Sequence, residues 1–275
     1  MHPTLLKFHG IELHSYGLLL AIAFLLGIQI FVARARARGL PEEAMHTLSL
    51  WLLVLAIAGG RVLFVLTHWG EYAADPMAIL RLWEGGLILY GGYLAAIGGG
   101  IVFVRRRGLP VWRVGDAAAP SMALGVAIGR LGCFMNGCCY GLPTHLPWGT
   151  HFPPGAMASY TFPGMAIHPS QLYLSGSSFL LFVAVLALDR TRRFDGWLFW
   201  GYIAFDALLR IVIDFTRYYD ETAVIGTMGP LTFNMNQVLS GGLIAISVVM
   251  LAILSRRREK PAPADVADAG AAPTA

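Results

Sequence analysis

The chain alternates between long apolar stretches and short polar ones. Each apolar stretch has about 20 residues, the length that a helix needs to cross the roughly 30 Å hydrocarbon layer of a membrane. The stretches that we expect to be spanning helices lie near residues 14–33, 47–67, 86–104, 115–135, 169–189, 196–215 and 235–255. The pattern therefore predicts an all-α, polytopic membrane protein whose seven transmembrane helices form one domain over residues 1–255.

Basic residues follow alternate apolar stretches. They come after the first, third, fifth and seventh, as Arg34, Arg36 and Arg38, as Arg105, Arg106, Arg107 and Arg113, as Arg190, Arg192 and Arg193, and as Arg256, Arg257, Arg258 and Lys260. Because Lys and Arg are enriched in the cytoplasmic loops of membrane proteins, these ends are predicted to be cytoplasmic. The N-terminus is then outside and the C-terminus inside, as an odd number of spans requires.

Composition supports an integral membrane protein. Hydrophobic residues make up 56% of the chain and charged residues only 13%, compared with about 25% charged residues in a soluble domain. The net charge of +4 comes from the basic clusters, so it reflects topology and predicts no nucleic-acid partner. The first stretch has its arginines after it and no clear cleavage site, which indicates a retained helix and not a signal peptide.

Two segments outside the spans differ from the rest. Residues 256–275 are basic and then rich in proline and alanine, which predicts a disordered cytoplasmic tail. The longest external loop, about 138–168, contains proline, glycine, histidine and aromatic residues but no Asp, Glu, Lys or Arg. We expect this loop to form a small cap against the membrane surface.

Three arginines lie within or at the outer ends of apolar stretches: Arg61, Arg130 and Arg210. A charged residue at the centre of a membrane helix costs about 2.5–3.5 kcal/mol on insertion scales, so each needs compensation. For Arg61 alone, extension of the side chain to the membrane surface or pairing with a carboxylate is an equally good explanation. The other two need a polar environment inside the protein.

One helical face concentrates charge. Asp206, Arg210, Asp214 and Arg217 recur at spacings of four, four and three residues, which places them on one side of a helix where ion pairs can form. Such a face cannot contact lipid. A polar interior that contains several arginines suits an anionic ligand such as a phosphate better than a cation.

The third apolar stretch is rich in glycine. Small residues four apart in its lower part predict close packing against another helix. Its outer end has two glycine pairs, Gly85 with Gly86 and Gly91 with Gly92. These would loosen the helix and expose backbone amides beside Tyr90, which suits contact with a lipid headgroup.

The cysteines Cys133, Cys138 and Cys139 lie close together near the outer end of the fourth stretch. In an oxidising compartment a disulfide is plausible. A metal site is less favoured because the cysteine spacing contains no CxxC pair, although histidines in the external loop leave that alternative open. We therefore predict no metal site.

Several motifs resemble those of the bacterial prolipoprotein diacylglyceryl transferases. The stretch GRLGCFMNGCCYG at 129–141 resembles the family signature, HPSQLY at 168–173 is another hallmark, and LRIVIDFTR at 209–217 resembles the segment with a second functional arginine. Shorter matches are HSYGLLL, AGGR and NQVLS. The resemblance extends over all seven predicted spans.

The resemblance implies a reaction and its partners. Members transfer the diacylglyceryl group from phosphatidylglycerol to the lipobox cysteine thiol of a preprolipoprotein, forming a thioether and releasing glycerol phosphate. The implied partners are phosphatidylglycerol, preprolipoprotein signal peptides and membrane lipids, with no cofactor and no metal. The implied location is the bacterial inner membrane, with the N-terminus and the cap loop in the periplasm.

Residue roles are carried over from the matching positions. The implied catalytic residues are Arg130, Arg210 and Tyr90. The implied substrate-binding residues are Arg130, Tyr16, Arg61, Asn136, Asp214, Gly91 and Gly92.

Three positions depart from the family pattern. Tyr90 stands where the family has a histidine considered as a base, Cys133 where asparagine is common, and Cys138 where glutamate is common. We expect the arginines to activate the incoming thiol in place of a strong base, with Tyr90 orienting a phosphate or ester oxygen. A disulfide between Cys133 and Cys138 would substitute mechanically for the lost polar contact.

Other functions remain open from the sequence. A diverged relative could keep the phospholipid pocket and use another acceptor. A membrane thiol oxidoreductase would use the cysteines, but the chain has no CxxC and no quinone or haem signature. A transporter would be favoured by internal repeats, and we find none.

Overall fold

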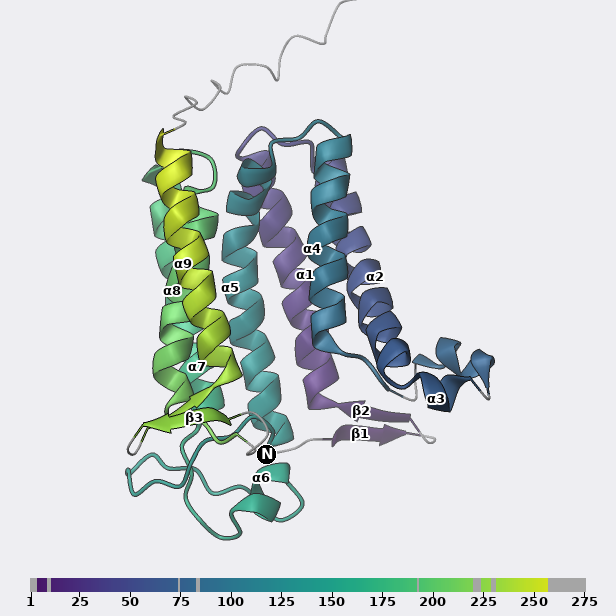
Figure 1. Ribbon diagram of the computed structural model, residues 1–275, viewed down its shortest axis with the longest axis vertical. Helices are drawn as coiled ribbons and strands as arrows, with labels where there is room; N and C mark the ends of the chain where they lie inside the picture. The colour runs from purple at the N-terminus through teal and green to yellow at the C-terminus, as the bar shows by residue number, and fades with distance from the viewer. Residues whose placement is uncertain are drawn as a thin grey trace, which may run out of the picture. The chain divides into compact units, whose positions relative to one another are not determined.

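The computed structural model describes residues 4–8, 11–73, 75–82, 85–191, 193–219, 224–228 and 231–256. The predicted disordered tail therefore lies outside the described residues, apart from Arg256. The described chain is mostly helical (Figure 1), which confirms the helical and membrane character expected from the apolar pattern.

The long helices coincide with the predicted apolar stretches. They are α1 (Ser15–Arg36), α2 (Glu42–Thr67), α4 (Leu89–Arg106), α5 (Val111–Asn136), α7 (Ser170–Leu188), α8 (Trp197–Asp214) and α9 (Met235–Arg256). The shorter elements are α3 (Trp69–Tyr72), α6 (Met157–Thr161) and the 3-10 helices η1 (Pro76–Leu80) and η3 (Asp189–Thr191).

Within the described ranges, five helices are long and apolar enough to cross a membrane. The other two long helices, α4 and α8, have 18 residues each. Glycines and terminal arginines lower the apolar character of α4, and three charged residues lower that of α8. The seven-span topology thus stays a prediction for these two.

Two β-hairpins are additions that the all-α prediction missed. Strands β1 (Thr4–Phe8) and β2 (Ile11–His14) pair antiparallel, and so do β3 (Val224–Met228) and β4 (Leu231–Asn234). Each hairpin leads directly into a long helix, α1 or α9. Each strand has only four or five residues, too few alternating positions to give a clear hydrophobic pattern in the sequence.

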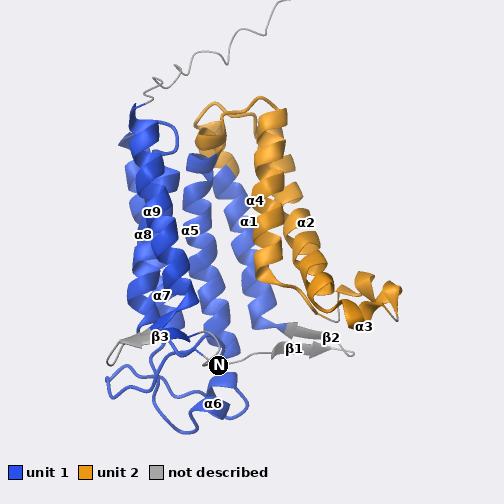
Figure 2. Ribbon diagram, in the orientation of Figure 1, with its two compact units in different colours: residues 1–31, 115–266 blue, residues 32–114, 267–275 orange. Residues whose placement is uncertain are grey.

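The chain divides into two compact units (Figure 2). Among the described residues, unit 1 comprises those within 1–31 and 115–266, and unit 2 comprises those within 32–114. In unit 2, helices α2 and α4 pack together along small residues. A Cβ atom at Gly59 would collide with Ala95 and with the backbone of Gly91, so glycine permits this close approach.

The core of unit 1 lies between α5, α7 and α8. Its buried residues are Ala119, Ala123, Leu181, Val185, Leu198 and Tyr202. Small alanines on α5 face larger side chains on the other two helices, which allows close packing. Helix α9 packs against α8.

The loop between α5 and α7 is a compact lobe with its own aromatic core. Tyr140, Ala158 and Ile167 are buried there, with Phe162 and Tyr218 packed against them. The rings of Tyr140 and Tyr218 stack at 5.7 Å. The predicted cap loop is therefore an ordered structure, while its periplasmic location stays a prediction.

Candidate active site

A buried carboxylate on α5 fixes the start of α8. Asp116 is 2% exposed, and its two oxygens accept hydrogen bonds of 2.9 Å from the backbone N–H groups of Gly196 and Phe199. These N–H groups belong to the first turn of α8, where an acidic cap satisfies otherwise unpaired donors. These hydrogen bonds hold the first turn of α8 beside Asp116 on α5.

This joint determines where the two helices carry their arginines. Fourteen residues separate Asp116 from Arg130, and fourteen separate Gly196 from Arg210. The starts of the two helices meet through Asp116, and the residues just after their ends meet as well, because the Leu142 N–H donates to the Thr216 carbonyl at 2.9 Å, so α5 and α8 run parallel. A helix rises 1.5 Å per residue, so both arginines lie about 21 Å beyond the joint, at the same height.

Arg130 and Arg210 are both half-buried, and both guanidinium groups act electrostatically on the Asp206 carboxylate. No hydrogen bond or salt bridge joins either guanidinium to another part of the chain that the structure describes. Two half-buried cations close to one carboxylate leave an excess of positive charge with unused N–H donors. This is the arrangement expected for binding an anion.

The signature stretch turns sharply after α5. Gly137 has a φ of 71°, its N–H donates to the Phe134 carbonyl, and the Cys138 N–H donates to the Cys133 carbonyl at 3.1 Å. These bonds form a Schellman motif, in which glycine adopts the left-handed conformation that ends a helix. The motif brings Cys138 back beside Cys133.

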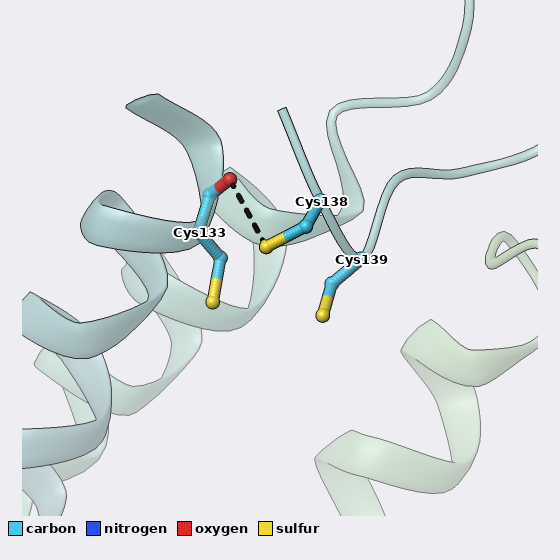
Figure 3. A group of neighbouring side chains, drawn as sticks. All are labelled: Cys133, Cys138 and Cys139. Atoms are coloured by element: carbon cyan, nitrogen blue, oxygen red, sulfur yellow. Dashed lines mark hydrogen bonds between the residues drawn. The ribbon is translucent and has the colours of Figure 1, made fainter. Parts of the chain in front are cut away.

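All three cysteines are free thiols in the structure. The hypothesis of a disulfide between Cys133 and Cys138 is therefore wrong for this structure. The Cys138 side chain instead lies 3.7 Å from the Cys133 carbonyl oxygen, because the Schellman turn aligns the thiol with the end of the helix (Figure 3).

Tyr16 lies at the first turn of α1 and packs against the signature. A Cβ atom at Gly132 would stand 3.0 Å from the Tyr16 ring, so glycine at that position makes room for the tyrosine. The Tyr16 hydroxyl lies within electrostatic range of Arg130 and of the cysteines. Asn136 is the last residue of α5 and is exposed. Unit 1 thus brings three of the predicted site residues to one end of α5.

The HPSQLY segment holds the signature turn in place. Gln171 is fully buried and donates from Nε2 to the Cys138 carbonyl at 2.8 Å. The Ser170 hydroxyl lies 3.0 Å from the Thr216 hydroxyl, just after α8. Gly141 contacts His168 and Ser170 so closely that any side chain at Gly141 would collide. The start of α7 therefore clamps the ends of α5 and α8 together.

Asp214 ends α8 in a buried polar group. The Tyr219 hydroxyl donates to Asp214 Oδ1 at 2.9 Å, and Arg217 donates to the Tyr219 hydroxyl at 2.9 Å. Burial raises the pKa of Tyr219 to about 12, so this tyrosine stays neutral at physiological pH. Asp214 also forms an ion pair with Arg217 at 3.8 Å. The N–H donors of Arg210 therefore remain available to a ligand.

Arg61 has a different environment in unit 2. It is 5% exposed, and its guanidinium donates five hydrogen bonds to backbone carbonyls, those of Ala78, Ile79, Arg81, Gly85 and Gly86. A guanidinium has five N–H groups, so every donor is used. Arg61 therefore fastens the segment between α2 and α4, and its predicted part in substrate binding has no remaining donor to support it.

The remaining predicted residues lie at the start of α4 in unit 2. Tyr90 is 55% exposed, and its hydroxyl makes no hydrogen bond to another described residue. Gly91 and Gly92 are buried where α4 approaches α2, and a Cβ atom at Gly92 would stand 2.7 Å from the Ala56 carbonyl oxygen. The structure gives these glycines a packing role, and their contact with substrate stays a prediction.

Sequence reasoning missed three residues that organise the site. Asp116 was overlooked, although a single carboxylate in an apolar helix signals a buried partner. Asp206 was noticed for its spacing but given no role. Gln171 lies inside a recognised motif, yet only the structure shows that it holds the signature turn.

The chain is similar in sequence to known proteins over nearly its whole length. The family model of prolipoprotein diacylglyceryl transferase matches residues 3–253. A phosphatidylglycerol–prolipoprotein diacylglyceryl transferase of Geobacter sulfurreducens is 34% identical over 268 residues, which cover 94% of this chain and 97% of that protein. Its counterpart in Trichormus variabilis is 32% identical over 271 residues, which cover 95% of this chain and 92% of that protein.

Proposed function

This chain belongs to the prolipoprotein diacylglyceryl transferase family, and from that premise we propose how its residues carry out the reaction. The protein is a membrane transferase that moves a diacylglyceryl group from phosphatidylglycerol to a prolipoprotein. In our proposal the acceptor is the cysteine thiol of the lipobox in the signal peptide. The thiol sulfur forms a bond to the glyceryl carbon, and the carbon–oxygen bond to phosphate breaks. Glycerol phosphate leaves with the electron pair.

The main observation behind the proposal is that Arg130 and Arg210 lie at the same distance along α5 and α8 and have no hydrogen bond or salt bridge to another described residue. Arg130 and Arg210 present planar N–H donors that match the oxygens of a phosphodiester. As the carbon–oxygen bond breaks, negative charge grows on the leaving phosphate, and fixed cations stabilise that charge more than they stabilise the substrate. The Asp206 carboxylate would offset part of this positive charge before the lipid arrives.

The same cations can assist the nucleophile. A free cysteine thiol has a pKa of about 8.5, so a few per cent is already thiolate at neutral pH. Positive charge from Arg130 would raise that fraction, and the thiol proton would leave to solvent. Tyr16, which lies within electrostatic range of Arg130 in unit 1, would orient the headgroup. Tyr90 would donate a hydrogen bond to a phosphate or ester oxygen.

We also propose a topology for the protein. Helices α1, α4 and α9 have arginines in their last turns, and Arg190 follows α7. If α4 and α8 also span, all four of these ends lie on one side, which the positive-inside rule assigns to the cytoplasm. Arg130, Arg210 and the loop lobe then face the periplasm of a bacterial inner membrane, where lipoprotein signal peptides arrive.

A reconstituted transfer assay tests the proposal. The purified protein is placed in vesicles with phosphatidylglycerol and a lipobox peptide, and mass spectrometry detects the diacylglyceryl adduct on the peptide cysteine. We expect an adduct with wild-type protein and with Arg190→Ala, and a loss of at least about a hundredfold with Arg130→Ala. No adduct from well-folded wild-type protein, beside an active control enzyme, would instead indicate a different acceptor.

A further inference from the structure

The three cysteines of the signature form one cluster (Figure 3). They are the only cysteines of the chain, all are free and half-buried, and their sulfur atoms lie within 4.8 Å of one another. The proposed transfer reaction uses none of them. Small apolar packing would explain one or two such residues, but it would not require three sulfur atoms to lie this close together.

The backbone holds this cluster in an unusual conformation. The Schellman turn brings Cys138 to Cys133, and Cys139 then adopts a φ of 59°, the one positive φ outside glycine in the described chain. This conformation costs free energy for a residue with a side chain. In this conformation the Cys139 sulfur lies within 4.8 Å of the other two sulfur atoms (Figure 3). The hydrogen bond from Gln171 to the Cys138 carbonyl, at 2.8 Å, secures the turn.

The spacing of the sulfur atoms suits a metal ion. A metal–thiolate bond is about 2.3 Å long, so three thiolates around one ion have sulfur atoms roughly 4 Å apart. The observed limit of 4.8 Å requires only small side-chain rotations to reach that geometry. Thiolate ligands select soft cations and not Mg²⁺ or Ca²⁺.

We propose that Cys133, Cys138 and Cys139 form a binding site for a thiophilic cation, either Cu⁺ or Zn²⁺. Each thiol loses its proton to solvent as its sulfur binds the ion, and no oxidant or reductant is involved. Three thiolates carry more negative charge than either ion neutralises. Arg130 and Arg217 act electrostatically on Cys139 and compensate this excess.

Occupation of the site would affect the neighbouring arginine. A bound metal–thiolate group is a net anion close to Arg130, so it would weaken the binding of a lipid phosphate to the same guanidinium. This consequence rests on the proposed function, whereas the metal site itself does not. Soft metal ions would then lower the activity of the enzyme, and chelators that remove these ions would restore it.

A binding experiment tests the site separately from catalysis. Reduced, metal-free protein is reconstituted in phosphatidylcholine nanodiscs without phosphatidylglycerol and titrated with Zn²⁺ or Cu⁺ against a chromophoric chelator. We expect one ion per protein, and X-ray absorption should show three sulfur ligands at about 2.3 Å. The sulfur count needs no variant, so it stands even if a substitution prevents folding. Fewer than three sulfur ligands, for both ions, would overturn the proposal.

Substitutions sharpen the result. Cys133→Ser and Cys139→Ser should each weaken binding of the preferred ion at least tenfold, while Mg²⁺ should not compete. Unchanged affinity in both variants would overturn the proposal as well.

In the transfer assay, a saturating dose of the preferred ion should lower the rate at least fivefold, with recovery on adding chelator. Full activity with the ion bound would contradict the effect on Arg130 and would not contradict the metal site itself.

Discussion

Arg61 in unit 2 and Arg130 in unit 1 are both arginines in apolar helices, yet their surroundings are opposite. Arg61 is buried and gives all its donors to backbone carbonyls. Arg130 is half-buried, has no hydrogen-bond partner among the described residues, and lies near Asp206, as Arg210 does. A guanidinium with every donor filled stabilises a fold, and one with open donors can bind a ligand. The number of hydrogen-bonded N–H donors therefore distinguishes a stabilising arginine from a ligand-binding one, which residue type and position in the helix do not.

Removing Arg61 should cause the largest loss of stability. Arg61→Ala leaves five carbonyls without their donor, which should cost about 3–5 kcal/mol in the free energy of unfolding. Arg61→Lys keeps the charge but has three donors, so an intermediate loss is expected. Unfolding in detergent by differential scanning fluorimetry measures both. A stable Arg61→Ala variant that binds phosphatidylglycerol less tightly would place Arg61 in the lipid site. Arg61 and Arg130 would then not differ in role.

Removing Arg210 should affect catalysis and spare stability. We expect Arg210→Gln to lower kcat/KM about 10²–10³-fold, as loss of one donor to a transition-state anion does. The free energy of unfolding should change by less than about 1 kcal/mol, because Arg210 makes no hydrogen bond to another described residue and Arg130 still acts on the Asp206 carboxylate. Arg190→Gln, at an exposed position of the same unit, is the matched control. Equal damage from both substitutions would contradict a specific role for Arg210.

The glycine packing of unit 2 predicts a smaller loss. A Cβ atom at Gly91 would collide with the Gly59 carbonyl and with Leu63, so Gly91→Ala should destabilise by about 1–3 kcal/mol. At Gly98 on the same helix nothing lies within 4 Å of such an atom, and Gly98→Ala should be neutral or stabilise by up to about 1 kcal/mol. Thermal unfolding compares the two. Similar behaviour would show that α2 and α4 do not pack this closely.

The smallest effect is expected at Asp206. Asp206→Asn removes the negative charge near Arg130 and Arg210, so both cations become more available to an anion. The dissociation constant for glycerol phosphate should fall about three- to tenfold, roughly 1 kcal/mol, as measured by calorimetry. Asp195→Asn removes the same charge before the start of α8 and should leave the constant unchanged. Weaker binding in Asp206→Asn would mean that the carboxylate mainly orients the arginines.

The helices were predictable because their signal is local. A run of apolar residues long enough to cross a membrane specifies a helix wherever the rest of the chain lies. The hairpins before α1 and α9 were not predictable in this way, since four or five residues per strand carry little pattern. The cysteine cluster was visible only as a spacing, and its pairing was mispredicted because the turn at Gly137 is a property of the folded backbone.

The sequence by itself determined the membrane character, the places of the long helices and the family, and it singled out Arg130 and Arg210 as candidate site residues, because each of these depends on residue type or on short spacings. Tertiary structure alone decided which N–H donors of each arginine are already hydrogen-bonded. Asp116 joins α5 to α8 and thereby sets Arg130 and Arg210 at one height, while carbonyls contributed by residues 78–86 fill every donor of Arg61. The reason is that a side chain's role depends on which donors its neighbours leave free, and those neighbours are distant in sequence.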